Sequence, residues 1–340
     1  MYNEKNEKSG DHMNIQHAFP KKTALPTQWT ALLHKTGLTA EDLPEHTVLL
    51  WDGDTLAATG SRSGGLIKYL AVDPAYQGED LTATVLTALR RAAFDEGYRH
   101  LFLYTKPTNR FLLQGLFFHP VAQTREILLM EDRPGGLKSF IAQLPRYEGE
   151  GIVGALVMNC DPFTCGHRHV IEQAAAQCGH VYVFVLSEDR GHFPAADRLA
   201  LVQAGTSHLS NVTVLPSGPY MISAATFPTY FLPHRDEAGT ARCALDVEIF
   251  AGHIAPALGI KRRYVGTEPL SALTEQYNRA LAVALPQRGI ELIEIPRLEM
   301  DGQPISASRV RALLSQGDLD AIEPLVPPTT YAYLKTHQEV

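Results

Sequence analysis

The residues best suited to phosphate chemistry lie at 159–169, directly after the apolar run 151–158. Thr164 and His167 are three positions apart, which places both at the start of a helix that opens after a buried strand. Free backbone N–H groups and the helix dipole favour anions at such a start. A histidine held there can donate a hydrogen bond to a phosphoryl oxygen as negative charge develops on it. Gly166 removes a side chain where a ligand must approach closely.

A second set of phosphate-binding residue types lies at 305–311, in the sequence ISASRVR. Ser306 has the type and position of a helix N-cap, and the hydroxyls of Ser306 and Ser308 can meet phosphate oxygens. Arg311 lies about one turn into the same helix, where its planar fork can reach back to the same anion. Taken alone, the pattern also fits an ordinary serine-capped surface helix.

The elements that position both sets alternate between strand and helix from residue 151 onward. Helices separate five apolar strands, which are expected at 151–158, 181–186, 212–215, 263–266 and 290–295. Apolar strands with helical crossovers predict a parallel sheet covered on both faces. Ligands bind outside the carboxyl ends of such strands, where both sets fall. The pair Arg262 and Arg263 is expected to lie at a solvated strand edge.

The first half of the chain has a different pattern, which predicts a compact mixed α/β domain. One helix is expected over 80–97, and strands are expected at 47–51, 56–60, 66–72, 100–105 and 126–130. Residues 1–20 are polar and without periodicity, as in a disordered tail. Residues 134–150 are rich in Pro, Gly and charge, as in a linker. The predicted division is a tail at 1–20, domains at 21–133 and 151–340, and a linker at 134–150.

Composition excludes several classes of function. The chain has 340 residues, with 30 Lys and Arg against 37 Asp and Glu, which gives a net charge of −7. This charge disfavours nucleic-acid binding, which needs clustered basic side chains. It lacks both an apolar run of the ~20 residues that cross a bilayer and a leading apolar signal segment, so we expect a cytoplasmic protein with no membrane partner. The four cysteines do not have zinc-site spacing, and we expect free thiols and no protein-bound metal.

Several motifs together resemble a known family. The T-x-G-H of 164–167, preceded by D-P-F, and the I-S-x-S-x-V-R of 305–311 are similar to signatures of the nucleotidyltransferase superfamily. The segments SEDRGHFPAADRLALVQAG, ISAATFPTYFL and RYVGTEPLSALTEQYN narrow the resemblance to the citrate lyase ligase family over residues 25–335. This resemblance implies an acetyltransferase-like mixed α/β domain followed by a Rossmann-like parallel-sheet nucleotidyltransferase domain. The family commonly has Asn where Asp161 stands.

The resemblance also implies an activity and roles for residues. ATP and acetate would form acetyl-AMP and pyrophosphate, with Mg²⁺ on the triphosphate. The acetyl group would then pass to the thiol of the phosphoribosyl-dephospho-CoA prosthetic group on the citrate lyase acyl carrier subunit. His167 and Thr164 would contact the reacting phosphates, while Ser306, Ser308 and Arg311 hold the departing pair. The remaining residues expected to line the nucleotide or acyl pocket are Asn159, Phe163, Gly166, Gly266, Thr267 and Glu268.

In the first half, strand 66–72 and the turn after it resemble the GCN5-related acetyltransferases. In that family a Q/R-x-x-G-x-G/A turn offers backbone N–H groups to the diphosphate of CoA. Gln77 is present here, but Asp80 stands at the first glycine position and Thr82 at the last small position. Because a carboxylate disfavours a diphosphate, the domain is expected to dock the carrier or its CoA-like arm.

Other functions fit the same motifs. An adenylyltransferase acting on a phosphorylated cofactor precursor would use the same nucleotide-binding residues, because these serve ATP and not the acceptor. A non-catalytic protein that senses nucleotide or CoA would explain the altered turn at 77–82, although the intact T-x-G-H argues against it. An acetyl-CoA-dependent acetyltransferase with an accessory nucleotide domain is disfavoured most by Asp80.

Overall fold

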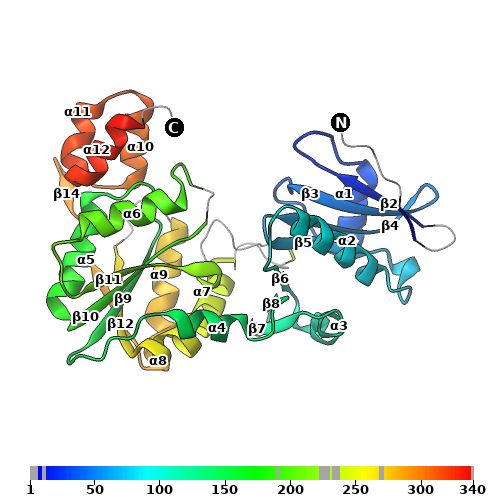
Figure 1. The fold of residues 1–340 in the computed structure, drawn as a ribbon, viewed down its shortest axis with the longest axis horizontal. Helices are drawn as coiled ribbons and strands as arrows, with labels where there is room; N and C mark the ends of the chain where they lie inside the picture. Colours follow the sequence, from blue (N-terminus) through cyan, green and yellow to red (C-terminus); the bar gives the residue numbers. More distant parts are fainter. Residues whose placement is uncertain are drawn as a thin grey trace. The chain divides into compact units, whose positions relative to one another are not determined.

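The computed structural model divides the chain into two compact units (Figure 1). It describes residues 7–9, 13–188, 191–221, 230–231, 238–267 and 272–337, with the backbone alone at 7–9, 238–239 and 272–273. The first unit comprises Met1–Gly136 and Pro228–Ala238, and the second comprises Leu137–Phe227 and Gly239–Val340. Each unit has its own sheet and its own apolar core, which is the organisation of a two-domain chain.

The first unit is built on an eight-stranded sheet with the order β1-β2-β3-β4-β5-β6-β8-β7. Its strands are β1 (Glu7–Ser9), β2 (Met13–Ala18), β3 (His46–Asp52), β4 (Thr55–Ser63), β5 (Leu66–Val72), β6 (Phe102–Thr105), β7 (His119–Gln123) and β8 (Leu128–Glu131). Neighbours are antiparallel except β5 and β6, which are parallel and paired only at Leu66–Phe102 and Ile67–Leu103. Past these positions β5 and β6 no longer pair with each other, although each stays paired with its other neighbour.

Three helices accompany this sheet: α1 (Thr27–Lys35), α2 (Leu81–Asp95) and α3 (Arg110–Gly115). The apolar positions of α2 recur at helical spacing, and Val85, Leu86 and Leu89 are buried in the core of the unit. The predicted mixed α/β domain is confirmed, with strands and a helix at the expected places.

Two parts of the predicted organisation differ from the structure. The prediction of a disordered tail over 1–20 is wrong for Met13–Ala18, which form β2 and pair with β3. Only Ile15 and Ala18 of this strand are buried, and three of its six residues are polar, so the sequence lacks the sustained apolar alternation that indicates a strand. The predicted linker over 134–150 contains α4 (Gly136–Gln143), whose Leu137 is buried.

The second unit is a five-stranded parallel sheet with the order β11-β10-β9-β12-β13. Its strands are β9 (Val153–Met158), β10 (His180–Val185), β11 (Val212–Pro216), β12 (Ile260–Gly266) and β13 (Glu291–Ile295). The predicted parallel sheet is confirmed. The strand order reverses between β9 and β12, and in sheets of this kind ligands bind at that switch point, outside the carboxyl ends of the strands.

Helices surround this sheet (Figure 1). They are α5 (Cys165–Gln177), α6 (Ala195–Gly205), α7 (Ala238–Ile249), α8 (Ala255–Leu258), α9 (Ala272–Ala284), α10 (Ala307–Ser315), α11 (Leu319–Ile322) and α12 (Pro328–Thr336), with a hairpin of β14 (Glu299–Met300) and β15 (Gln303–Pro304) before α10. In Figure 1, α10, α11 and α12 are grouped at one end of the sheet and α8 lies at the other. The last three helices share an apolar cluster that includes Val310, Ile322 and Leu334. In the described part of the chain no helix combines the length and apolarity needed to span a bilayer.

Candidate active site

The turn after β9 carries the first predicted set of residues. Thr164 is the N-cap of α5, and its hydroxyl accepts the backbone N–H of His167 at 3.3 Å. In return, Nδ1 of His167 accepts the backbone N–H of Thr164 at 3.1 Å. This reciprocal cap satisfies N–H groups of the helix start and fixes the imidazole ring. The two residues that the sequence singles out are therefore in direct contact.

The cap also determines which nitrogen of His167 carries the proton. Because Nδ1 accepts a backbone N–H, the neutral ring holds its proton on Nε2. Burial and, to a smaller extent, the positive charge of Arg297 lower the pKa of His167 from 6.5 to about 4. The ring is neutral near pH 7, and its Nε2–H is a fixed hydrogen-bond donor at the start of α5.

Phe163 and Gly166 support this turn from inside the unit. Phe163 is fully buried, stacks on the His167 ring and packs against Gly205, where a Cβ would lie 2.5 Å from the phenyl ring. Because the Phe163 side chain has no exposed surface, it supports the turn from below, and a contact of this residue with a nucleotide stays a prediction for its backbone. At Gly166 a Cβ would lie 2.7 Å from the carbonyl oxygen of Ile305. The sequence predicts that the missing side chain leaves space for a ligand, but in the structure the backbone at Ile305 lies there.

Asp161, between β9 and the turn, is committed to a neighbouring loop. Its carboxylate accepts the backbone N–H groups of His192 at 3.1 Å and of Phe193 at 2.9 Å. Gly191 allows this approach, because a Cβ there would lie 2.8 Å from Oδ1 of Asp161. A carboxylate has two acceptor oxygens where an asparagine amide has one. The acid that departs from the family pattern therefore fastens residues 191–193 to the turn.

α10 brings the second predicted set to the first. Ser306 is its N-cap and accepts the backbone N–H of Arg309 at 3.1 Å. Arg311 donates through Nη1 to the carbonyl oxygen of Asp161 and through Nη2 to the hydroxyl of Ser308 at 3.1 Å. Nη1 also lies 3.7 Å from the Asp161 carboxylate. Arg311 thus joins two motifs that are 150 residues apart in the chain.

Asn159 reaches a residue that the sequence analysis does not single out. Arg198 of α6 is fully buried and donates through Nη1 to the side-chain oxygen of Asn159 at 2.6 Å and to its carbonyl oxygen at 2.8 Å. The same guanidinium donates to the carbonyl oxygens of Glu188 and Phe193. Arg198 therefore holds together the loops that follow β9 and β10. Its place inside the family-like segment 187–205 is the only signal in the sequence.

The predicted residues at the end of β12 lie against another arginine. The backbone N–H of Thr267 donates to the carbonyl oxygen of Ile295 at 2.9 Å. Arg297 donates its backbone N–H to the Thr267 hydroxyl at 3.1 Å and its Nε to the Thr267 carbonyl oxygen at 2.7 Å. The positive charge of Arg297 also lowers the pKa of His167. Arg297 therefore links the end of β12 with the start of α5. Glu268 lies outside the described residues.

The four cysteines are free thiols. Among the residues that the structure describes, no group of three or more His, Cys, Asp and Glu side chains could hold a metal ion. The side chains of the two predicted motifs offer hydroxyl, imidazole and guanidinium groups, which are donors suited to phosphate oxygens.

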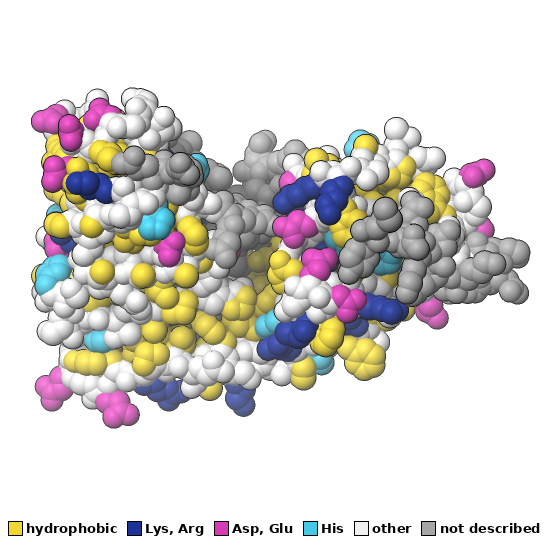
Figure 2. All heavy atoms as spheres, turned by 45° about the horizontal axis from the view of Figure 1, so that its top comes forward, with side chains coloured by type: hydrophobic (Ala, Val, Ile, Leu, Met, Phe, Trp, Pro, Cys, Tyr) yellow, Lys and Arg dark blue, Asp and Glu magenta, His cyan; other side chains and the backbone are white. Residues whose placement is uncertain are grey.

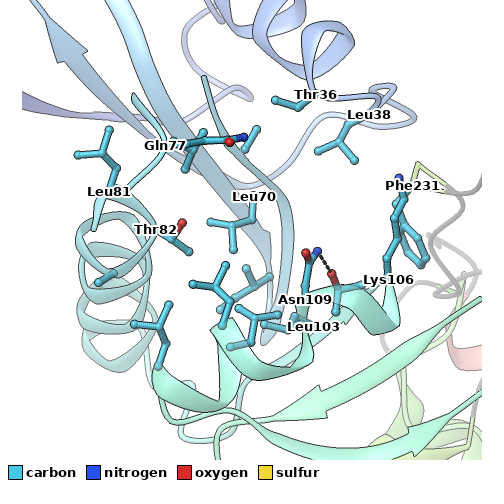
Figure 3. A pocket seen from close by; sticks show the side chains of 18 of the residues that line it. Thr36, Leu38, Leu70, Gln77, Leu81, Thr82, Leu103, Lys106, Asn109 and Phe231 are labelled. Carbon is cyan, nitrogen blue, oxygen red and sulfur yellow. Dashed lines mark hydrogen bonds between the residues drawn. The ribbon is translucent and has the colours of Figure 1, made fainter. Parts of the chain in front are cut away.

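The first unit contains a pocket of about 580 Å³ where β5 and β6 diverge (Figure 3). Leu70 and Leu103 line it from the two strands, and Thr82 lines it from the start of α2. Tyr230 and Phe231, which belong to this unit although they come far later in the chain, complete its lining. The lining of the pocket therefore combines apolar side chains with polar ones, among them Gln77, Lys106 and Asn109.

The turn beside this pocket carries negative charge. Asp80 is the residue before α2, has a left-handed φ of +49° and makes no side-chain cap hydrogen bond. Glu79 and Asp80 are both exposed and both line the pocket. At the place where the acetyltransferase pattern offers glycine and N–H groups to a diphosphate, this chain therefore presents two carboxylates.

Comparison with known proteins agrees with the two units. Residues 153–334 match the family model of the citrate lyase ligase C-terminal domain, and residues 16–114 match that of the acetyltransferase (GNAT) family. The chain is 41% identical over 285 residues to citrate (pro-3S)-lyase ligase of Klebsiella pneumoniae, with 82% of this chain and 83% of that protein covered. It is 38% identical over 312 residues to the ligase of the same name from Escherichia coli K12, with 89% and 88% covered.

A shorter match has a different name. Phosphopantetheine adenylyltransferase of Corynebacterium glutamicum strain R is 28% identical over 125 residues, which cover 34% of this chain and 69% of that protein.

Proposed function

The chain belongs to the citrate lyase ligase family, and from this premise we propose that it is an ATP-dependent ligase that activates citrate lyase. Its substrates would be ATP, acetate and the acyl carrier subunit of citrate lyase, with the phosphoribosyl-dephospho-CoA group that the carrier bears. The observation that carries the proposal is the neutral, capped His167 at the carboxyl end of β9, a donor held ready for a phosphate oxygen.

The reaction has two steps. A carboxylate oxygen of acetate attacks the α-phosphorus of ATP, the bond to the bridging oxygen breaks, and pyrophosphate leaves with the electron pair of that bond. The thiol of the carrier then loses its proton and attacks the carbonyl carbon of acetyl-AMP. AMP leaves, and the acetyl group remains on the carrier as a thioester. In the first step the protein acts mainly by positioning and by stabilising charge.

The described residues take separate roles in the first step. The Nε2–H of His167 donates to a phosphate oxygen on which charge develops, and the Thr164 cap holds the ring for this. Arg311, with Ser306 and Ser308, binds the departing β- and γ-phosphates. Asn159 and Gly166 act through the chain, as contacts of Arg198 and Ile305, while Gly266, Thr267 and Glu268 remain the proposed lining of the nucleotide or acyl pocket.

Mg²⁺ enters as part of the nucleotide substrate, held by phosphate oxygens and water as is usual for this ion. Both oxygens of the Asp161 carboxylate accept backbone N–H groups. We therefore assign Asp161 the role of holding the loop at 191–193 and not that of a Mg²⁺ ligand. We place the protein in the cytoplasm, where thiols remain reduced.

The first unit would receive the carrier or its prosthetic arm. Its pocket is lined by apolar residues such as Leu70 and Leu103 and by polar residues such as Thr82 and Asn109, which suits a pantetheine-like chain with its amide groups. The carboxylates of Glu79 and Asp80 disfavour the diphosphate of free CoA at the adjacent turn. This combination suits an arm that is delivered by a protein partner more than a free coenzyme.

The test is exchange of radiolabelled pyrophosphate into ATP, measured with Mg²⁺ and with or without acetate. Exchange that requires acetate and is lost in His167→Ala is the expected result. The matched control is His169→Ala, a histidine on the same helix that should leave the exchange unchanged. If neither exchange nor AMP appears when deacetylated citrate lyase carrier is added, the ligase function is contradicted.

The similarity to phosphopantetheine adenylyltransferase supports one alternative function. In it, the phosphate of a phosphorylated cofactor precursor would attack ATP in place of acetate. Replacing acetate by 4′-phosphopantetheine in the exchange assay separates the two functions. Exchange that depends on phosphopantetheine and ignores acetate would establish the adenylyltransferase.

A further inference from the structure

A buried arginine in the second unit has no ionic partner among the residues that the structure describes. Arg242, on α7, is 6% exposed and lies over the ring of Tyr277 at 4.2 Å from the ring centroid. Its Nε is buried without a hydrogen-bond partner. We call Arg242, Asp246, Arg263 and Tyr277 the Arg242 cluster, which α7, β12 and α9 contribute.

The one acid of the Arg242 cluster is already committed. Asp246 accepts from Nη1 of Arg263 at 2.7 Å and from the hydroxyl of Tyr277 at 2.6 Å, and it is 2% exposed. Arg263 also lies over the ring of Phe250. Within the described ranges, no carboxylate is within ion-pair distance of Arg242. Asp246 is thus paired with Arg263 and not with Arg242.

An excess of buried positive charge requires an anion. A buried ion costs free energy unless it is paired and hydrogen-bonded, and the planar fork of arginine matches a carboxylate through two parallel hydrogen bonds. Stacking on Tyr277 keeps the guanidinium plane in one orientation. Arg242 therefore has the properties of a binding group whose partner is a ligand.

The Arg242 cluster lies next to the carboxyl end of β12. Asn278, the residue after Tyr277 on α9, donates through Nδ2 to the carbonyl oxygen of Gly266, the last residue of β12. A Cβ at Gly266 would lie 3.7 Å from the side chain of Val170 on α5, the helix that begins beside His167. Tyr277, on which Arg242 stacks, is therefore next in the chain to a residue that contacts the carboxyl end of β12, the side of such a sheet where ligands bind.

We propose that Arg242 binds the carboxylate of a short monocarboxylic acid, the acyl substrate of this enzyme. The inference rests on the proposed function, which requires such an acid beside the nucleotide. In this role Arg242 donates to one carboxylate oxygen of the acid, and the other oxygen attacks the α-phosphorus. Arg242 does not donate to the phosphates. The neutral, aromatic surface of Tyr277 forms the floor beneath the guanidinium.

The test combines direct binding with kinetics on the full chain. Acetate binding is measured by ¹³C-acetate NMR, with inorganic phosphate as the competing anion, in the wild type and in Arg242→Met. The expected result is a loss of acetate affinity of about tenfold or more in Arg242→Met, and in the exchange assay a matching rise in KM for acetate with KM for ATP within about twofold. Arg262→Met, which removes an arginine already paired with Glu291, is the matched control and should bind acetate normally.

Each outcome decides between the inference and the function. If the wild type shows acetate-dependent exchange and Arg242→Met binds acetate as tightly as the wild type, the inference is overturned and the proposed function stands. Acetate binding that requires Arg242 without acetate-dependent exchange supports the site and contradicts the function. Phosphate that displaces acetate at equal concentration overturns the carboxylate assignment. If Arg242→Met fails to fold, Arg242→Lys keeps the charge over Tyr277, and unchanged acetate affinity in that variant also overturns the proposal.

Discussion

The two units each place a turn and a helix start after a sheet strand, yet the two turns carry opposite preferences for charge. After β9, the start of α5 is capped by Thr164 and presents the neutral Nε2–H of His167. After β5, the start of α2 follows Asp80, which has a left-handed backbone and makes no cap bond. The side chains around a helix N-terminus thus strengthen or oppose the attraction of its dipole for an anion.

Removing the donor of the second unit should have the largest effect. We expect His167→Ala to lower the exchange rate by about 10²–10³-fold, as the loss of a donor to a developing charge does, with ATP affinity little changed. His167→Gln keeps an N–H donor and an acceptor for the Thr164 N–H, so it should retain more activity. Single-turnover rates and equilibrium ATP binding separate the two effects, and a near-normal rate in His167→Ala would contradict the role.

Removing Arg311 should weaken binding as well as turnover. This guanidinium joins α10 to the β9 turn, and we expect Arg311→Ala to weaken ATP affinity by about tenfold, in the range of one charge-assisted hydrogen bond. Calorimetric titration with MgATP measures the change. Arg279→Ala removes an exposed arginine paired along α9 and should bind ATP as the wild type does. Mild, equal effects of Arg311→Ala and His167→Ala would mean that the two residues do not have separate roles.

Making the first turn resemble a diphosphate-binding turn should sharpen the comparison. Asp80→Gly removes a carboxylate and places glycine where φ is +49°, so we expect affinity for free CoA to rise about fivefold. Fluorescence competition with CoA can measure it. Asp54→Gly, in the hairpin turn between β3 and β4, removes the same charge away from the pocket. Equal CoA binding by both variants would show that Asp80 does not oppose the diphosphate.

The smallest effect is expected from pH. Since the pKa of His167 is about 4 and its ordinary value is 6.5, the folded state favours the neutral ring. Its contribution to stability is present above pH 6.5 and is lost as pH falls toward 4. The ratio of exchange rates of wild type and His167→Gln should therefore stay constant between pH 6 and 8. A transition in that ratio near pH 6.5 would show that the pKa of His167 has its ordinary value.

Local patterns in the sequence predict the parallel sheet and the contact between Thr164 and His167. Both depend on residues close in the chain, through strand periodicity and the three-residue spacing of a helix cap. The same reasoning fails for β2, whose two buried side chains are too few to distinguish a strand from a polar tail.

Contacts between segments that are distant in the sequence could not be predicted. The partners of Asp161 are backbone groups at 192 and 193, and those of Arg198 include carbonyl oxygens on the two loops that follow β9 and β10. No spacing rule connects such positions. The prediction of a solvated edge at Arg263 is wrong for the same reason, because β12 lies between β9 and β13 and Asp246 of α7 covers this side chain.

Tyr230 and Phe231 also bear on how the chain is made. A ribosome adds roughly 5–20 residues per second, so on the order of ten seconds separate the synthesis of Gly136 from that of Tyr230. During this interval the sheet of the first unit lacks the ring that will lie 4.7 Å from that of Tyr69, measured between centroids. The N-terminal domain is thus finished by the C-terminal half of the gene, and a gene cut after residue 136 encodes an incomplete domain.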